Sequence, residues 1–127
     1  MLEHHQFMEG ETWIVFLLSD TPIKTQRDGE YYLIGMMDAA TGLIIGNVLQ
    51  SVNDSELSSA LVREILDKGL MQTGSAAGTL ILPTDQFGTV FSSEAERRGM
   101  TVVTVPFEQL LRVIGHARES FKEYFGH

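Results

Sequence analysis

Five acidic residues follow predicted strands or stand near the predicted starts of helices, where they could hold divalent metal ions. The five are Asp20, Asp54, Glu56, Asp85 and Glu108. Carboxylate oxygens are the ligands that Mg²⁺ prefers, and two such ions can stabilise the attacking and leaving oxygens of a phosphoryl transfer. Asp20 and Asp85 should be close, because each follows one of two predicted neighbouring strands. One hypothesis is therefore a Mg²⁺ or Mn²⁺ site, with Asp20, Asp85, Glu108 and Glu56 as candidate ligands.

A second interpretation of the same acids needs no metal. Acidic side chains are favoured in the first turn of a helix, because the helix dipole and the free backbone N–H groups attract them. All of the five acids except Asp20 are predicted to occupy such turns. Asp20 is the first residue of a polar ten-residue loop, "DTPIKTQRDG", and does not lie on a rigid strand. The sequence therefore favours helix capping, and it predicts no catalytic residue and no cofactor.

Asp38 and His116 could also do chemistry, but their spacing favours structural roles. Asp38 ends an apolar segment just before "AATG", so its carboxylate is predicted to accept backbone hydrogen bonds at a hairpin corner. A metal-binding His116 would need a ligand four residues away, and those positions hold Arg112 and Ser120. We expect His116 to be a partly exposed helix residue.

Composition limits the classes of partner. The chain of 127 residues has a net charge of −8, and its nine Lys and Arg residues are scattered, so nucleic acid is a disfavoured partner. It has no Cys, which suits a reducing cytoplasm, and no apolar run approaches the roughly 20 residues of a membrane helix. Residues 1–10 are polar and predict a flexible leader, and residues 11–127 predict one cytoplasmic domain.

Hydrophobic spacing along the chain predicts three strands, then a helix, and then two strand–helix pairs. The predicted strands cover residues 12–19, 30–38, 43–51, 79–83 and 100–105. The predicted helices cover residues 54–71, 84–98 and 106–125.

Polar residues and an apolar stripe define these helices further. Asn53 is predicted to cap the first helix with Glu56 at the capping-box position, and Thr84 is predicted to cap the second. In the last helix, apolar residues at helical spacing are expected to pack on the sheet. This stripe includes Leu110, Leu111, Ile114 and Phe121.

The order of elements over residues 11–125 resembles the ribonuclease-H-like α/β fold. Within that group, "YYLIGMMDAATG" and "LPTDQFGTVFSS" resemble the second-strand and fourth-strand stretches of integrase and transposase cores. The Asp-x-x-Thr-Gly hairpin also resembles that of short bacterial domains of unknown function. The resemblance implies βββαβαβα topology, a five-stranded mixed sheet of order 3-2-1-4-5 with residues 12–19 in the middle, and helices on both faces.

Two departures from the integrase pattern affect the expected function. Integrase cores carry a metal-binding Asp inside the first strand just after a Trp, where this chain has Phe16. Two residues, not one, separate Asp85 from Gly88. We therefore expect a non-catalytic domain that binds a protein, a second copy of itself or a small ligand. The alternative is a divalent-metal-dependent nuclease or phosphoryl-transfer enzyme that uses the acidic sheet edge.

Overall fold

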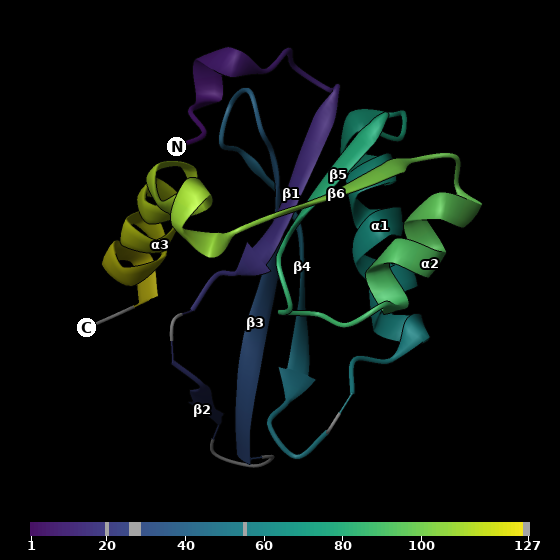
Figure 1. The fold of residues 1–127 in the computed structure, drawn as a ribbon. Coiled ribbons are helices and arrows are strands. Elements are labelled where there is room, and N and C mark those ends of the chain that lie inside the picture. Colours follow the sequence, from purple (N-terminus) through teal and green to yellow (C-terminus); the bar gives the residue numbers. More distant parts are fainter. Residues whose placement is uncertain (20, 26–28, 55, 126–127) are drawn as a thin grey trace.

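A computed structural model describes residues 1–19, 21–25, 29–54 and 56–125, in which a mixed sheet separates two layers of helices (Figure 1). The strands are β1 (Thr12–Leu17), β2 (Ile23–Thr25), β3 (Gly29–Asp38), β4 (Ile44–Ser51), β5 (Thr79–Pro83) and β6 (Thr101–Val105). The α-helices are α1 (Ser59–Thr73), α2 (Val90–Arg97) and α3 (Leu111–Phe125), and the 3-10 helices are η1 (His4–Gln6) and η2 (Phe107–Leu110).

The sheet has the predicted strand order, with β1 in the middle of β4-β3-β1-β5-β6. β3 is antiparallel to both β1 and β4, whereas β5 is parallel to β1 and β6 is parallel to β5. The predicted loop after β1 is wrong in one part, because Ile23–Thr25 forms the short strand β2. Tyr31 of β3 pairs with Ile23 on one side and Ser51 on the other, so β2 continues the line of β1 along β3.

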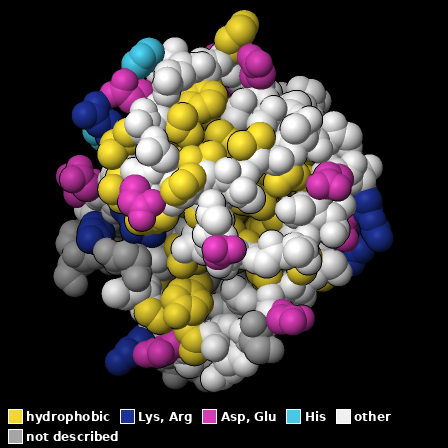
Figure 2. All heavy atoms as spheres, viewed as in Figure 1, with side chains coloured by type: hydrophobic (Ala, Val, Ile, Leu, Met, Phe, Trp, Pro, Cys, Tyr) yellow, Lys and Arg dark blue, Asp and Glu magenta, His cyan; other side chains and the backbone are white. Residues whose placement is uncertain are grey.

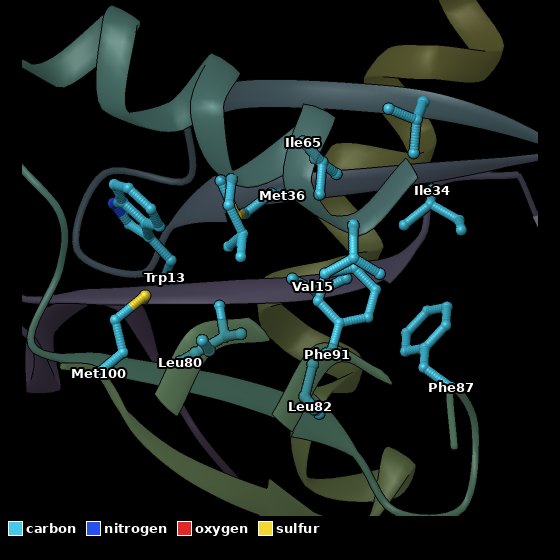
Figure 3. Packing of buried hydrophobic residues seen from close by; sticks show 14 of the residues in the cluster. Trp13, Val15, Ile34, Met36, Ile65, Leu80, Leu82, Phe87, Phe91 and Met100 are labelled. Atoms are coloured by element: carbon cyan, nitrogen blue, oxygen red, sulfur yellow. The ribbon is translucent and has the colours of Figure 1, made fainter. Parts of the chain in front are cut away.

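The central strand β1 is buried on both faces, as its uninterrupted apolar sequence predicts. Successive side chains of a strand point to opposite faces of a sheet. Trp13 and Val15 belong to the core between the sheet and helices α1 and α2 (Figure 3). Ile14 and Phe16 belong to a second core beneath α3. The sheet is therefore covered by helices on both faces.

Helix α1 begins later than predicted, and Asn53 is not its cap. The Ser58 side chain accepts a hydrogen bond from the Leu61 N–H and is the N-cap. The Asn53 N–H instead donates to the Ser51 hydroxyl at 3.2 Å, in a turn that ends β4. Local side-chain bonds of this kind compete with helix formation, which explains the delayed start.

Helix α2 also begins later, at Val90, and the predicted Thr84 cap is wrong. The Thr84 N–H donates to the Val105 carbonyl at 3.0 Å, which holds this residue against the end of β6. The following turn contains two residues of positive φ, Asp85 at 61° and Gly88 at 65°. Left-handed backbone interrupts a right-handed helix, so the helix cannot begin before this turn is complete.

The stripe predicted for the last helix is correct except at one position. Leu110 ends η2 and is buried, and Ile114 of α3 is 1% exposed. Leu111 is 44% exposed, so its predicted place in the core is wrong. Successive residues of a helix lie about 100° apart around its axis, so Leu111 stands beside the face that Leu110 and Ile114 turn toward the sheet.

The segment that precedes β1 contacts the domain on the α3 side of the sheet (Figure 1). The Leu2 N–H donates to the Gln109 carbonyl at 2.7 Å, and Leu2 and Phe7 pack against the core beneath α3. Glu3 pairs with Arg112 of α3. Polarity predicted a flexible leader here, and two of its apolar side chains, Leu2 and Phe7, pack against the domain.

Gly46 lets β4 approach α1 closely. A Cβ on Gly46 would lie 3.1 Å from the Ile65 carbonyl oxygen and 3.2 Å from the Lys68 Cβ. Gly46→Ala should therefore lower the free energy of unfolding by about 1–3 kcal/mol in urea melts, because the helix must move away from the sheet. Gly35→Ala is the matched control, since its nearest contact would be an ordinary 3.4 Å. Equal stability of the two variants would contradict this account.

Candidate functional site

Two adjoining cavities lie where β4 and β5 end, at the carboxyl edge of the sheet. One has a volume of about 480 Å³ and is lined by Asp54, Glu56 and Tyr32, among others. The other has a volume of about 410 Å³ and is lined by Asp85 and Thr84, among others. The turn at residues 86–89 forms a wall of both cavities. Ligands of open α/β sheets bind at this edge, which makes it a candidate site.

The structure brings some of the predicted acids together here. Glu56 and Asp54 line the same cavity, and Asp85 lines the adjoining one. Glu108 is not among the described residues that line either cavity. It stands in the first turn of η2, which lies on the α3 side of the sheet, while the segment before α1 lies on the other side (Figure 1). Asp20 lies outside the described residues.

Helix capping explains fewer of these acids than predicted. Glu108 does occupy a first helical turn. Asp54 and Glu56 precede α1, and Asp85 stands in the turn before α2, so the capping interpretation is wrong for these three residues. Asp85 is exposed and has left-handed backbone, which Asp tolerates better than most residues. The three acids therefore occupy loops.

Within the described ranges, no group of three or more His, Asp or Glu side chains is close enough to hold a metal ion. That finding leaves out Asp20, one of the four candidate ligands. Figure 2 shows acidic side chains spread over one face of the molecule, with Lys and Arg at its margins. This face carries no stripe of basic residues, which a phosphate backbone would require.

Asp38 is a hairpin corner residue, as predicted. Its two carboxylate oxygens accept hydrogen bonds from the backbone N–H groups of Gly10 and Ala40, each at 2.9 Å. The backbone N–H of Gly42 donates to the Asp38 carbonyl at 2.8 Å and closes the turn. The carboxylate therefore ties the corner between β3 and β4 to the segment before β1.

Phe16 stands near the place on β1 where the resemblance to integrase cores implies a metal-binding Asp. Its side chain is 0% exposed and belongs to the core beneath α3. Phe16 pairs with Gly35 of β3, and its ring atom Cζ would lie 3.6 Å from a Cβ added to Gly35. The ring thus lies at van der Waals distance from the neighbouring strand, and this position is filled by apolar packing.

A separate groove on the opposite side of the sheet was missed by sequence reasoning. It runs between α3 and strands β3 and β4, and two hollows of about 610 Å³ and 670 Å³ form it. Both are lined by Leu18, Asn47 and Phe121, so they adjoin one another. His116 is exposed and lines the first hollow. No local pattern could reveal the groove, because its walls come from distant parts of the chain.

The strand order and the helices on both faces define a ribonuclease-H-like fold. Solved structures with this arrangement include retroviral integrase catalytic cores. The HTLV-2 integrase catalytic core domain in complex with magnesium, in its dimeric form, matches with a TM-score of 0.60 and 12% identity. That match covers 92% of this chain and 73% of the integrase chain.

Two further structures have the same fold. The trimeric form of that HTLV-2 domain matches with a TM-score of 0.60 and 12% identity over 92% of this chain and 72% of its own. The simian T-cell lymphotropic virus intasome in complex with PP2A regulatory subunit B56 gamma matches with a TM-score of 0.57 and 13% identity. That match covers 94% of this chain and 43% of the intasome chain. At these identities the likeness establishes the fold alone.

No protein-family model and no curated protein matches the sequence. Among the described residues, no helix has the length and apolar character needed to cross a membrane.

Proposed function

We propose that the chain is a non-catalytic ribonuclease-H-like domain that acts by binding a protein or a small ligand. The observation that carries this proposal is Phe16. A metal-dependent nuclease needs carboxylates held rigidly around its ions, and β1 is the central strand of this sheet, buried on both faces. At the matching position of β1, the chain has a fully buried phenylalanine.

Charge supports binding partners other than nucleic acid. A net charge of −8 repels phosphate groups, and the basic residues form no continuous stripe in the sequence. A second copy of the chain is one protein partner that suits the proposal, since two of the similar structures are described as dimeric and trimeric.

A divalent-metal-dependent nuclease or phosphoryl-transfer enzyme is the second candidate. The observation in its favour is the pair of adjoining cavities at the carboxyl edge, with Asp54 and Glu56 in one and Asp85 in the other. Mg²⁺ or Mn²⁺ would be the cofactor, and Asp20 would complete the carboxylate set. The similar HTLV-2 domain is described in complex with magnesium.

A turnover assay separates the two candidates. Purified protein with Mn²⁺ or Mg²⁺ should leave mixed single- and double-stranded DNA and RNA intact. Turnover that is lost in both Asp20→Asn and Asp85→Asn would overturn the proposal and establish the nuclease. Glu96→Gln is the matched control, because Glu96 is an exposed acid on α2 away from both cavities.

Metal binding gives an independent measurement in the same samples. An ion that binds only the folded chain adds about 2.7 kcal/mol of stability at a hundredfold excess over Kd. We expect the addition of Mn²⁺ to change neither the melting temperature of the wild type nor that of Asp85→Asn. A rise in the wild type alone would support the carboxylate site.

A further inference from the structure

The groove between α3 and strands β3 and β4 has the size and lining of a small-ligand site. Ligand pockets have volumes of about 300–1,000 Å³ and are mostly apolar, with a few polar groups. The two hollows of the groove, at about 610 Å³ and 670 Å³, both fall in this range. Leu18 and Phe121 form the floor that they share, and Asn47 is the polar residue common to both.

Apolar side chains also reach solvent along the rim of the groove. Leu43 is 59% exposed and lines the first hollow, and Leu49 is 46% exposed and lines the second. Covering such side chains stabilises a complex by about 25 cal/mol for each Å² of apolar surface removed from water. The groove therefore favours an occupant with an apolar body.

The described residues that line the groove differ in charge type from the chain as a whole. The protein has 17 Asp and Glu residues against nine Lys and Arg, yet none of the described residues that line either hollow is acidic. The ionisable residues of the lining are His4, His116 and Lys122, all of which can carry positive charge. In the first hollow, a ligand with a negative group would meet two histidines and, among the described lining residues, no carboxylate.

His4 is held in place at one end of the groove. Its Nδ1 lies 2.7 Å from the Ala39 carbonyl oxygen, so Nδ1 carries a hydrogen and donates it. Its ring lies over Gly42, where an added Cβ would be only 3.0 Å from the ring. Nε2 is left to accept a hydrogen bond, or to donate one to an anion once it is protonated. His116 lines the same hollow, so two imidazoles face one cavity.

We infer that this groove binds a small amphipathic carboxylate, with the carboxylate at His4 and His116 and the apolar chain along Leu18 and Phe121 toward Leu49. This inference rests on the proposed function and names the class of ligand. A free small molecule suits the site because each hollow has the volume of a ligand pocket and because apolar walls alternate with a few polar groups.

The experiment uses three probes with the same ten-carbon chain and different head groups. Decanoate, decanol and decyltrimethylammonium are titrated below their micelle concentrations, with calorimetry for Kd and ¹H–¹⁵N NMR for the location. Decanoate should bind at least tenfold more tightly than the cationic probe, and its amide shifts should centre on β4 and on α3 near His116. Equal affinities, no binding or shifts elsewhere would overturn the inference.

Three variants test the two parts of the site. His116→Glu should weaken decanoate binding about tenfold, whereas His5→Glu makes the same charge change on an exposed residue outside the groove and should not. Ser120→Trp should abolish binding, because Ser120 is an exposed residue that lines the first hollow and a large ring would fill it. If His116→Glu and Ser120→Trp bind decanoate as tightly as the wild type does, the assignment is contradicted.

Sedimentation of the same samples distinguishes another occupant. A dimer that Ser120→Trp converts to a monomer, with no decanoate bound by the wild type, would assign the groove to a second copy and overturn the inference. That result would leave the non-catalytic proposal intact, since the nuclease assay tests the proposal separately.

Discussion

Replacing Ile114 by Ala should lower the free energy of unfolding by about 2–5 kcal/mol. The side chain is 1% exposed and lies in the core beneath α3 with Phe16 and Leu110. Removing it leaves a cavity that the closely packed neighbours can fill only in part. Urea melts followed by circular dichroism measure the change.

The neighbouring Leu111→Ala is the matched control for this prediction. Leu111 is 44% exposed, so its truncation should cost less than about 1 kcal/mol. The two variants remove similar volumes from positions three residues apart on one helix and differ mainly in burial. If Ile114→Ala and Leu111→Ala lower the free energy of unfolding equally, the assignment of Ile114 to the buried face of α3 and of Leu111 to its exposed face would be wrong.

Placing a carboxylate on β1 should be still more costly. Phe16→Asp should lower the free energy of unfolding by more than about 4 kcal/mol, because it removes a buried ring and buries an unpaired charge. Phe16→Leu keeps the position apolar and should cost only about 1–2 kcal/mol. A chain that is unfolded under native conditions counts as the expected result for Phe16→Asp.

The same variant bears on the proposed function. Suppose that the free energy of unfolding of Phe16→Asp lies within about 1 kcal/mol of the wild-type value and rises when Mn²⁺ is added. That result would mean that β1 accepts a metal ligand. In that case the wild-type chain would be only one carboxylate short of a metal site at the carboxyl edge, and the nuclease hypothesis would be favoured. Phe16→Asn separates the effect of charge from that of lost packing, because it is nearly isosteric with Asp and neutral.

Local sequence predicted the features that depend on local spacing. The continuous apolar run in β1 identified a strand buried on both faces, and the order of strands and helices identified the sheet topology. The corner role of Asp38 followed from its place before "AATG" and was confirmed by two backbone hydrogen bonds. These features need only the alternation of side chains and the chemistry of a turn.

Helix starts were less predictable, because several residues compete to begin a helix. Asn53 and Thr84 are good caps in isolation, but Ser51 holds Asn53 in a turn and Val105 holds Thr84 beside β6. The second contact joins residues far apart in the chain. Leu111 illustrates a related limit, since helical spacing alone did not show that it lies at the exposed edge of the apolar stripe.

The sequence by itself thus determined the class of fold, the central strand and the apolar residue at Phe16. Only the tertiary structure decided which acids share a cavity and where a groove lies on the surface. Asp54 and Glu56 come to face the turn after β5, and His4 reaches the groove beside His116. Segments distant in sequence build both sites, and spacing along one element carries no information about where two such segments meet.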